Sequence, residues 1–107
     1  MIIKPGAIIA GLHPVMRSVL READKIWKAH GEELVVTAGL DGTHSAASWH
    51  YYGLALDFRT KYFLQPQVRS VGADLKMALP DYDIIIHSTH IHAEVGNKLA
   101  KEIGVYY

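Results

Sequence analysis

The chain has 107 residues, a net charge of zero from 11 basic and 11 acidic side chains, and no cysteine. This length predicts a single domain over residues 1–107. The balanced charge argues against a nucleic-acid partner, the lack of cysteine excludes disulfides and thiol nucleophiles, and the longest apolar runs are too short to cross a membrane.

Helices are expected to alternate with pairs of strands along the chain. Apolar residues at helical spacing predict a first helix over residues 14–30 and a second over 66–79. Short connections favour antiparallel pairing within each pair of strands, so the expected fold is α+β with a small central antiparallel sheet and flanking helices. The expected strands are 33–39, 53–60, 82–86 and 90–95, and a short last helix is expected over 97–103.

The strand at 53–60 contains a carboxylate that an apolar strand would not be expected to hold. Side chains alternate between the faces of a strand, so the leucines and Phe58 form a core face while Asp57 and Arg59 share the other. A carboxylate in a buried strand needs a partner. Arg59 could pair with Asp57 or bind a carboxylate of a substrate.

The strand at 90–95 shows the same alternation, with His90, His92 and Glu94 together on its polar face. Imidazole nitrogens and a carboxylate oxygen, without cysteine, suit Zn²⁺ at about 2.0–2.2 Å. Three such ligands leave a fourth position for a water molecule that ionises near neutral pH. The spacing alone is weak, because histidines on strands are more often exposed or hydrogen-bonded than metal ligands.

Longer sequence strings resemble those of a known family. The segment S-W-H-Y-Y-G-L-A-L-D at 48–57 resembles the S-x-H-x-x-G-x-A-x-D signature of zinc peptidases that include D-Ala-D-Ala carboxypeptidases, D-Ala-D-Ala dipeptidases and the L-alanyl-D-glutamate endopeptidases of phage lysins. The hedgehog signalling domain shares their fold. The segment H-I-H-A-E at 90–94 resembles the family's last zinc-binding segment, and T-A-G-L-D-G at 37–42 resembles a loop that precedes the signature.

This resemblance implies a fold with a central antiparallel sheet and a site with one zinc ion. It places Ser48 at the substrate edge of the site and makes His90 a neighbour that could hydrogen-bond the substrate or a developing oxyanion. The zinc ligands that it implies are His50, Asp57 and His92.

The sequence departs from the family at Thr89. The family has an aspartate or glutamate three residues before the last zinc histidine, which acts as general base and then as general acid. A threonine hydroxyl cannot do this at neutral pH, and losing a positioned base typically costs about 10²–10⁴-fold in rate. Three explanations stay open: His87 or Glu94 transfers the proton, the protein binds zinc without cutting, or the natural residue has been replaced.

The resulting hypothesis is a monomeric zinc peptidase that hydrolyses peptidoglycan stem peptides. The alternative, which Thr89 favours, is a catalytically impaired zinc-binding module that binds a peptide or a protein partner. The N-terminus lacks the pattern of a signal peptide, so synthesis in the cytoplasm is expected. The localisation stays open, and a phage-encoded lysin released to the cell wall is one option.

Overall fold

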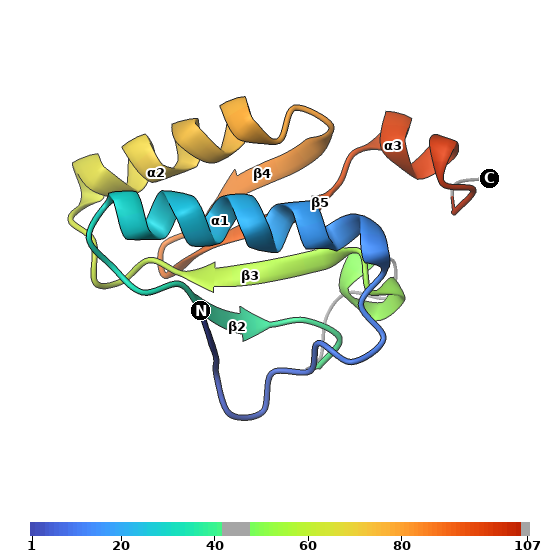
Figure 1. Cartoon of the computed structure of the whole chain (residues 1–107), viewed down its shortest axis with the longest axis horizontal. Helices are drawn as coiled ribbons and strands as arrows, with labels where there is room; N and C mark the ends of the chain where they lie inside the picture. Colours follow the sequence, from blue (N-terminus) through green and yellow to red (C-terminus); the bar gives the residue numbers. More distant parts are fainter. Residues whose placement is uncertain (42–47, 106–107) are drawn as a thin grey trace.

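The computed structural model describes residues 1–41 and 48–105, which form a five-stranded sheet with two long helices packed over one face (Figure 1). The strand order is β1-β2-β3-β5-β4, and every neighbouring pair is antiparallel except the parallel pair β1–β2. This confirms the expected α+β class. The strands are β1 (Ile2–Ile3), β2 (Val35–Ala38), β3 (Ala55–Arg59), β4 (Tyr82–Ile86) and β5 (His90–Val95).

The core lies between the sheet and the two long helices. Helix α1 places Val19, Ala23 and Trp27 four residues apart on one buried face, which is the spacing that lines up one side of a helix. The ring of Trp27 meets that of Phe58 on β3 edge to face, with centroids 5.6 Å apart. The helices are α1 (Arg17–Ala29), α2 (Gln65–Ala78) and α3 (Asn97–Glu102), with short 3₁₀ helices η1 (Pro14–Met16) and η2 (Trp49–Tyr52).

The two faces of the sheet differ as the alternation predicted. On β5, Ile91, Ala93 and Val95 are buried in the core, whereas the three residues that alternate with them are only partly buried. On β3, Leu56 and Phe58 are likewise buried. The face of the sheet turned away from the core therefore carries the polar side chains of both strands.

Two elements were not expected from the sequence, β1 and η2. Strand β1 has two residues, Ile2 and Ile3, which is too short for an alternating pattern, and it forms because it pairs with the start of β2. The first expected helix starts with the 3₁₀ turn η1 before α1 continues it. Within the described part of the chain, no helix is both long enough and apolar enough to cross a membrane.

Candidate metal centre

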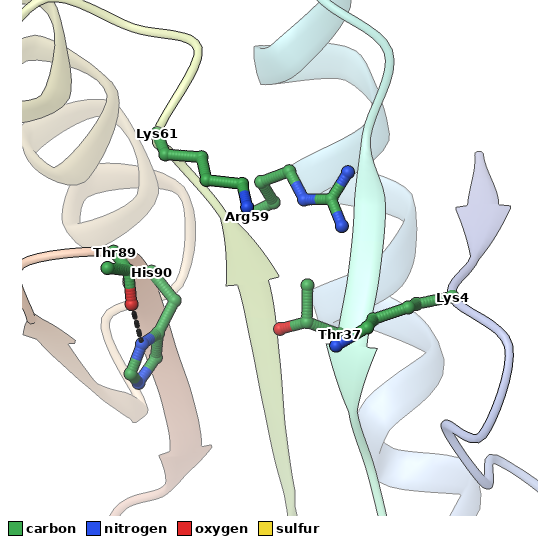
Figure 2. A pocket seen from close by; sticks show the side chains of 6 residues that line it. All are labelled: Lys4, Thr37, Arg59, Lys61, Thr89 and His90. Atoms are coloured by element: carbon green, nitrogen blue, oxygen red, sulfur yellow. Dashed lines mark hydrogen bonds between the residues drawn. The ribbon is translucent and has the colours of Figure 1, made fainter.

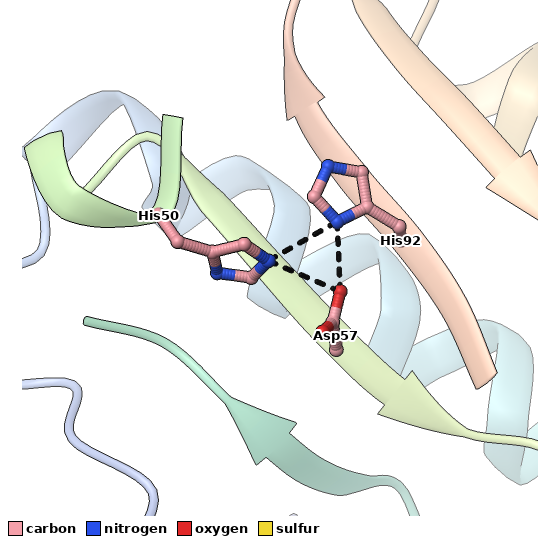
Figure 3. Close-up of side chains that lie close together, drawn as sticks. All are labelled: His50, Asp57 and His92. Carbon is pink, nitrogen blue, oxygen red and sulfur yellow. Dashed lines mark hydrogen bonds and ion pairs between the residues drawn. The ribbon is translucent and has the colours of Figure 1, made fainter. Parts of the chain in front are cut away.

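Three side chains from three elements meet on the polar face of the sheet (Figure 3). His50 comes from η2, Asp57 from β3 and His92 from β5. Asp57 and His92 are direct partners in the β3–β5 register, so the sheet itself places them side by side. The structure thus brings together the three residues that the sequence resemblance implied as metal ligands.

The three facing atoms form a small triangle. The Nδ1 atom of His92 lies 2.8 Å from Oδ1 of Asp57 and 3.2 Å from Nε2 of His50, and the third side, from Nε2 of His50 to Oδ1 of Asp57, measures 3.3 Å. Ligands about 2.0–2.1 Å from a tetrahedral zinc ion are separated by about 3.3 Å. The donor atoms therefore have the types that such an ion needs, and two of their three separations match its geometry, whereas the third, 2.8 Å, is that of a hydrogen bond.

Outer hydrogen bonds fix which nitrogen of each imidazole faces the triangle. The Nδ1 atom of His50 lies 2.8 Å from the carbonyl oxygen of Gly39, which can only accept, so Nδ1 carries the hydrogen. The Nε2 atom of His92 lies 2.7 Å from Oε1 of Glu94 and donates to that carboxylate. Once it is deprotonated, each ring presents a lone pair toward Asp57, which is how ligand histidines are oriented in metal sites.

Three acceptors at such distances require a positive charge among them, either a proton or a metal ion. Burial raises the pKa of Asp57, but hydrogen bonds from His50 and His92 outweigh burial and hold this pKa well below its usual range. Burial lowers the pKa of His92, but hydrogen bonds to Asp57 and Glu94 outweigh it and raise the pKa to about 9. Asp57 is therefore ionised at neutral pH, and the cluster attracts a cation.

The triangle is buried on one side and open on the other. The His50 side chain is only 3% exposed, while those of Asp57 and His92 are 13% and 12% exposed. Two histidines and one carboxylate form the ligand set of a catalytic zinc site, which keeps a position for water or substrate. The partly exposed side of the triangle is where that position would lie.

The loop after β2 aligns His50. Oδ1 of Asp41 accepts hydrogen bonds from the backbone N–H groups of Gly39 and Ile8, both at 2.8 Å. A Cβ atom on Gly39 would lie 2.2 Å from the carbonyl oxygen of Ile8, so only glycine allows this approach. The segment at 37–42 thus holds the carbonyl that orients His50; Gly42 itself lies outside the described residues.

Ser48 lies at the start of η2, where its Oγ atom accepts the backbone N–H of His50 at 3.2 Å. This is the geometry of an N-cap, which stabilises the first turn of a helix. Gly53 ends η2 in the left-handed region at φ 69°, and the chain turns there into β3. The residues that flank His50 in the signature therefore build the short helix that presents it.

His90 and Thr89 lie beside the triangle. The Nε2 atom of His90 is 3.9 Å from Oδ2 of Asp57, and its Nδ1 atom is 3.2 Å from the hydroxyl of Thr89. Burial lowers the pKa of His90, and the neighbouring histidines His87 and His92 add to this effect although Asp57 opposes it. His90 is therefore a neutral ring at pH 7, at the open side of the candidate metal centre.

A pocket of about 350 Å³ has His90, the neighbour of Asp57, in its lining (Figure 2). Arg59 lies in this pocket, and among the described residues it makes no ion pair with Asp57. The sequence reasoning missed two of its cations, Lys4 and Lys61, because neither belongs to a motif. The residues that line the pocket are Lys4, Thr37, Arg59, Lys61, Thr89 and His90.

Comparison with known proteins does not assign the chain to a family. No protein-family model matches it, and a search of curated proteins finds no match.

Proposed function

We propose that the chain is a zinc-dependent peptidase that hydrolyses peptidoglycan stem peptides, as a D-Ala-D-Ala carboxypeptidase or an L-Ala-D-Glu endopeptidase. The observation that carries this proposal is the convergence of Nε2 of His50, Oδ1 of Asp57 and Nδ1 of His92 within 3.3 Å of one another. This ligand set is typical of catalytic zinc. The substrate class rests on the resemblance of residues 48–57 to the signature of zinc peptidases.

Bound zinc supplies Lewis-acid chemistry and lowers the pKa of water. The chain's own residues supply orientation: the Gly39 carbonyl and the Glu94 carboxylate hold the two ligand rings. His90 lies close enough to the centre to hydrogen-bond a substrate oxygen there. Because Glu94 accepts a hydrogen bond from His92, an orienting role for Glu94 is favoured over proton transfer.

A second candidate function is a module that binds zinc and a peptide without cutting the peptide. Thr89 favours this candidate, because its hydroxyl occupies the position where the resembled family has a carboxylate. Thr89 is exposed and hydrogen-bonded to His90, so it adds no acid or base to the site.

Digestion of purified peptidoglycan tests the first proposal. The zinc-loaded protein, the chelator-treated protein and the His92→Ala variant are incubated with the same material, and the products are analysed by mass spectrometry. The expected result is a set of fragments released only by the zinc-loaded protein, whose masses identify the bond that is cut. Release of the same fragments by His92→Ala would refute a metal-dependent peptidase.

The Thr89→Glu variant separates the two candidates. If the chain is a slow peptidase, restoring a carboxylate is expected to raise the rate by up to about 10²–10⁴-fold. If zinc stays bound and Thr89→Glu releases no fragments, the chain is a binding module. A chelator titration of both proteins checks that the substitution leaves zinc in place.

A further inference from the structure

The pocket beside the candidate metal centre gathers three cations (Figure 2). Lys4 follows β1, Arg59 ends β3 and Lys61 lies two residues further along, and in Figure 2 their side chains border the same space. Two threonine hydroxyls and one imidazole complete the lining, to which no described residue contributes a carboxylate. In a chain of zero net charge, this is a local concentration of positive charge.

Within the part of the chain that the structure describes, these cations lack salt-bridge partners. Among the described residues, no carboxylate lies within 4.0 Å of Lys4, Arg59 or Lys61. Lys25 and Lys28 of α1, by contrast, each pair with an acidic residue one turn away. Three unpaired cations around one pocket repel one another, and an anion in the pocket would relieve that repulsion.

The register of the sheet ties this pocket to the metal centre. Arg59 pairs with His90 across β3 and β5, one step on the same face from the pair formed by Asp57 and His92. Two residues along a strand correspond to about 7 Å, which is also the repeat of an extended peptide. A bound peptide with one group at the metal centre therefore reaches the pocket within one or two residues.

We propose that the pocket binds a carboxylate of the substrate, so that the substrate is an acidic peptide with this carboxylate within one or two residues of the bond at the metal centre. This inference rests on the proposed function. The guanidinium of Arg59 suits two-point recognition of a carboxylate, the lysines act as point charges, and the hydroxyls of Thr37 and Thr89 can donate hydrogen bonds. A nucleic acid fits less well, because its affinity depends on many phosphate contacts.

Equilibrium binding tests the inference independently of cleavage. A fluorescent stem peptide with free carboxylates, and the same peptide with its carboxylates amidated, are titrated into the full chain with zinc and with chelator. Amidation is expected to weaken binding at least about 10-fold, in line with the loss of a charge-assisted hydrogen bond. Binding that is indifferent to amidation would overturn the inference.

Substitutions assign the selectivity to the pocket. Arg59→Gln and the exposed Lys61→Gln are each expected to weaken binding of the free peptide about 10-fold and to leave the amidated peptide unaffected. The matched control is Lys76→Gln, at an exposed position of α2, which removes one charge away from the pocket. Equal losses for both peptides, or an equal loss for the control, would overturn the inference.

Two experimental outcomes distinguish a failure of this inference from a failure of the proposed function. Charge-selective binding without any hydrolysis would refute the peptidase and leave the carboxylate site standing. Hydrolysis that is unchanged in the double variant Arg59→Gln/Lys61→Gln would refute the carboxylate site and leave the peptidase standing. Displacement of the peptide by a single-stranded oligonucleotide at lower concentration than by free stem peptide would also overturn the inference.

Discussion

At the scale of single residues, the centre depends on the outward nitrogen of each ligand imidazole. A backbone carbonyl holds His50 and a carboxylate holds His92, so the two rings are oriented by groups of different strength. Hydrogen bonds to a charged acceptor are roughly twice as strong as those to a neutral one. Of these two outer groups, Glu94 is therefore the one whose loss should weaken metal binding more.

Truncation of Glu94 is expected to weaken zinc binding about 10–100-fold, because outer partners of this kind fix ring orientation and raise ligand basicity. Competition with a metal indicator measures the affinity of Glu94→Ala. The matched control is Glu102→Ala, an exposed residue at the end of α3. An unchanged affinity in Glu94→Ala would remove the orienting role assigned to this carboxylate.

Zinc binding is expected to oppose the pH dependence of stability that His92 gives the metal-free protein. Folding raises the pKa of His92 from 6.5 to about 9, so protonated His92 stabilises the metal-free protein below pH 6.5, and this contribution is lost as the pH rises toward 9. Asp57 does not affect this window, because its lowered pKa matters only in acid. Zinc needs the unprotonated ring, so the stabilisation by zinc grows over the same window.

Thermal melts across this range, with chelator and with zinc, measure both trends. The melting temperature of the metal-free protein should fall between pH 6.5 and about 9, while the increase caused by zinc should grow. His92→Gln should flatten both trends. A metal-free melting temperature that is constant over this range would contradict the assignment of the proton to His92.

At the scale of elements, the junction of η2 and β3 carries the site. Gly53 has a φ of 69° and packs against the segment before α1, where its carbonyl accepts the N–H of His13 at 3.0 Å. A Cβ atom there would lie 2.7 Å from the carbonyl oxygen of Gly11. The N-terminal segment therefore buttresses the turn that joins His50 to the strand of Asp57.

Gly53→Ala is expected to destabilise the protein more than Gly6→Ala. Both positions have positive φ, which costs about 1–2 kcal/mol for alanine, but a Cβ on Gly6 meets nothing within 4 Å. The collision at Gly53 adds about 1–3 kcal/mol. Urea unfolding of both variants measures the difference, and equal losses would show that the turn is not packed as described.

At the scale of the whole molecule, the three ligands tie together η2, β3 and β5. Unfolding must separate these elements and would release the proposed zinc ion, so zinc should shift the equilibrium toward the folded chain. Free zinc at 1,000 times its Kd is expected to raise the free energy of unfolding by about 4 kcal/mol. Denaturant titrations with zinc and with chelator measure this gain.

Asp57→Asn provides the control for this experiment, because the amide keeps the shape of the carboxylate and removes its charge. Zinc should stabilise this variant far less than the parent. Equal stabilisation of both proteins would place the bound zinc elsewhere on the chain.

Much of the fold follows from local patterns in the sequence. Strands β4 and β5 have the expected bounds, 82–86 and 90–95, and the two long helices start and end within a few residues of the expected positions. These elements have strong periodicity, which is set by neighbouring residues. Strand β1 was missed because a two-residue strand depends on a distant partner and has no period of its own.

The candidate site, like the fold, could be predicted from the sequence only in part. The alternation on β3 and β5 placed Asp57, His90, His92 and Glu94 on one face, and the register confirms this. The role of the Gly39 carbonyl was beyond sequence reasoning, because backbone groups leave no signature. The cationic pocket was missed for a different reason: Lys4 reaches Arg59 only through the pairing of β1, β2 and β3.

The strand order also has a consequence for the kinetics of folding. Asp57 and His92 are 35 residues apart, with α2 and β4 between them, whereas β4 and β5 form a local hairpin. Local hairpins close early, and β3 joins β5 only after a long loop has closed. Zinc should therefore bind after the rate-limiting step of folding, so that it slows unfolding and leaves the refolding rate nearly unchanged. Stopped-flow measurements with and without the ion would show this as movement of the unfolding arm of the chevron plot alone.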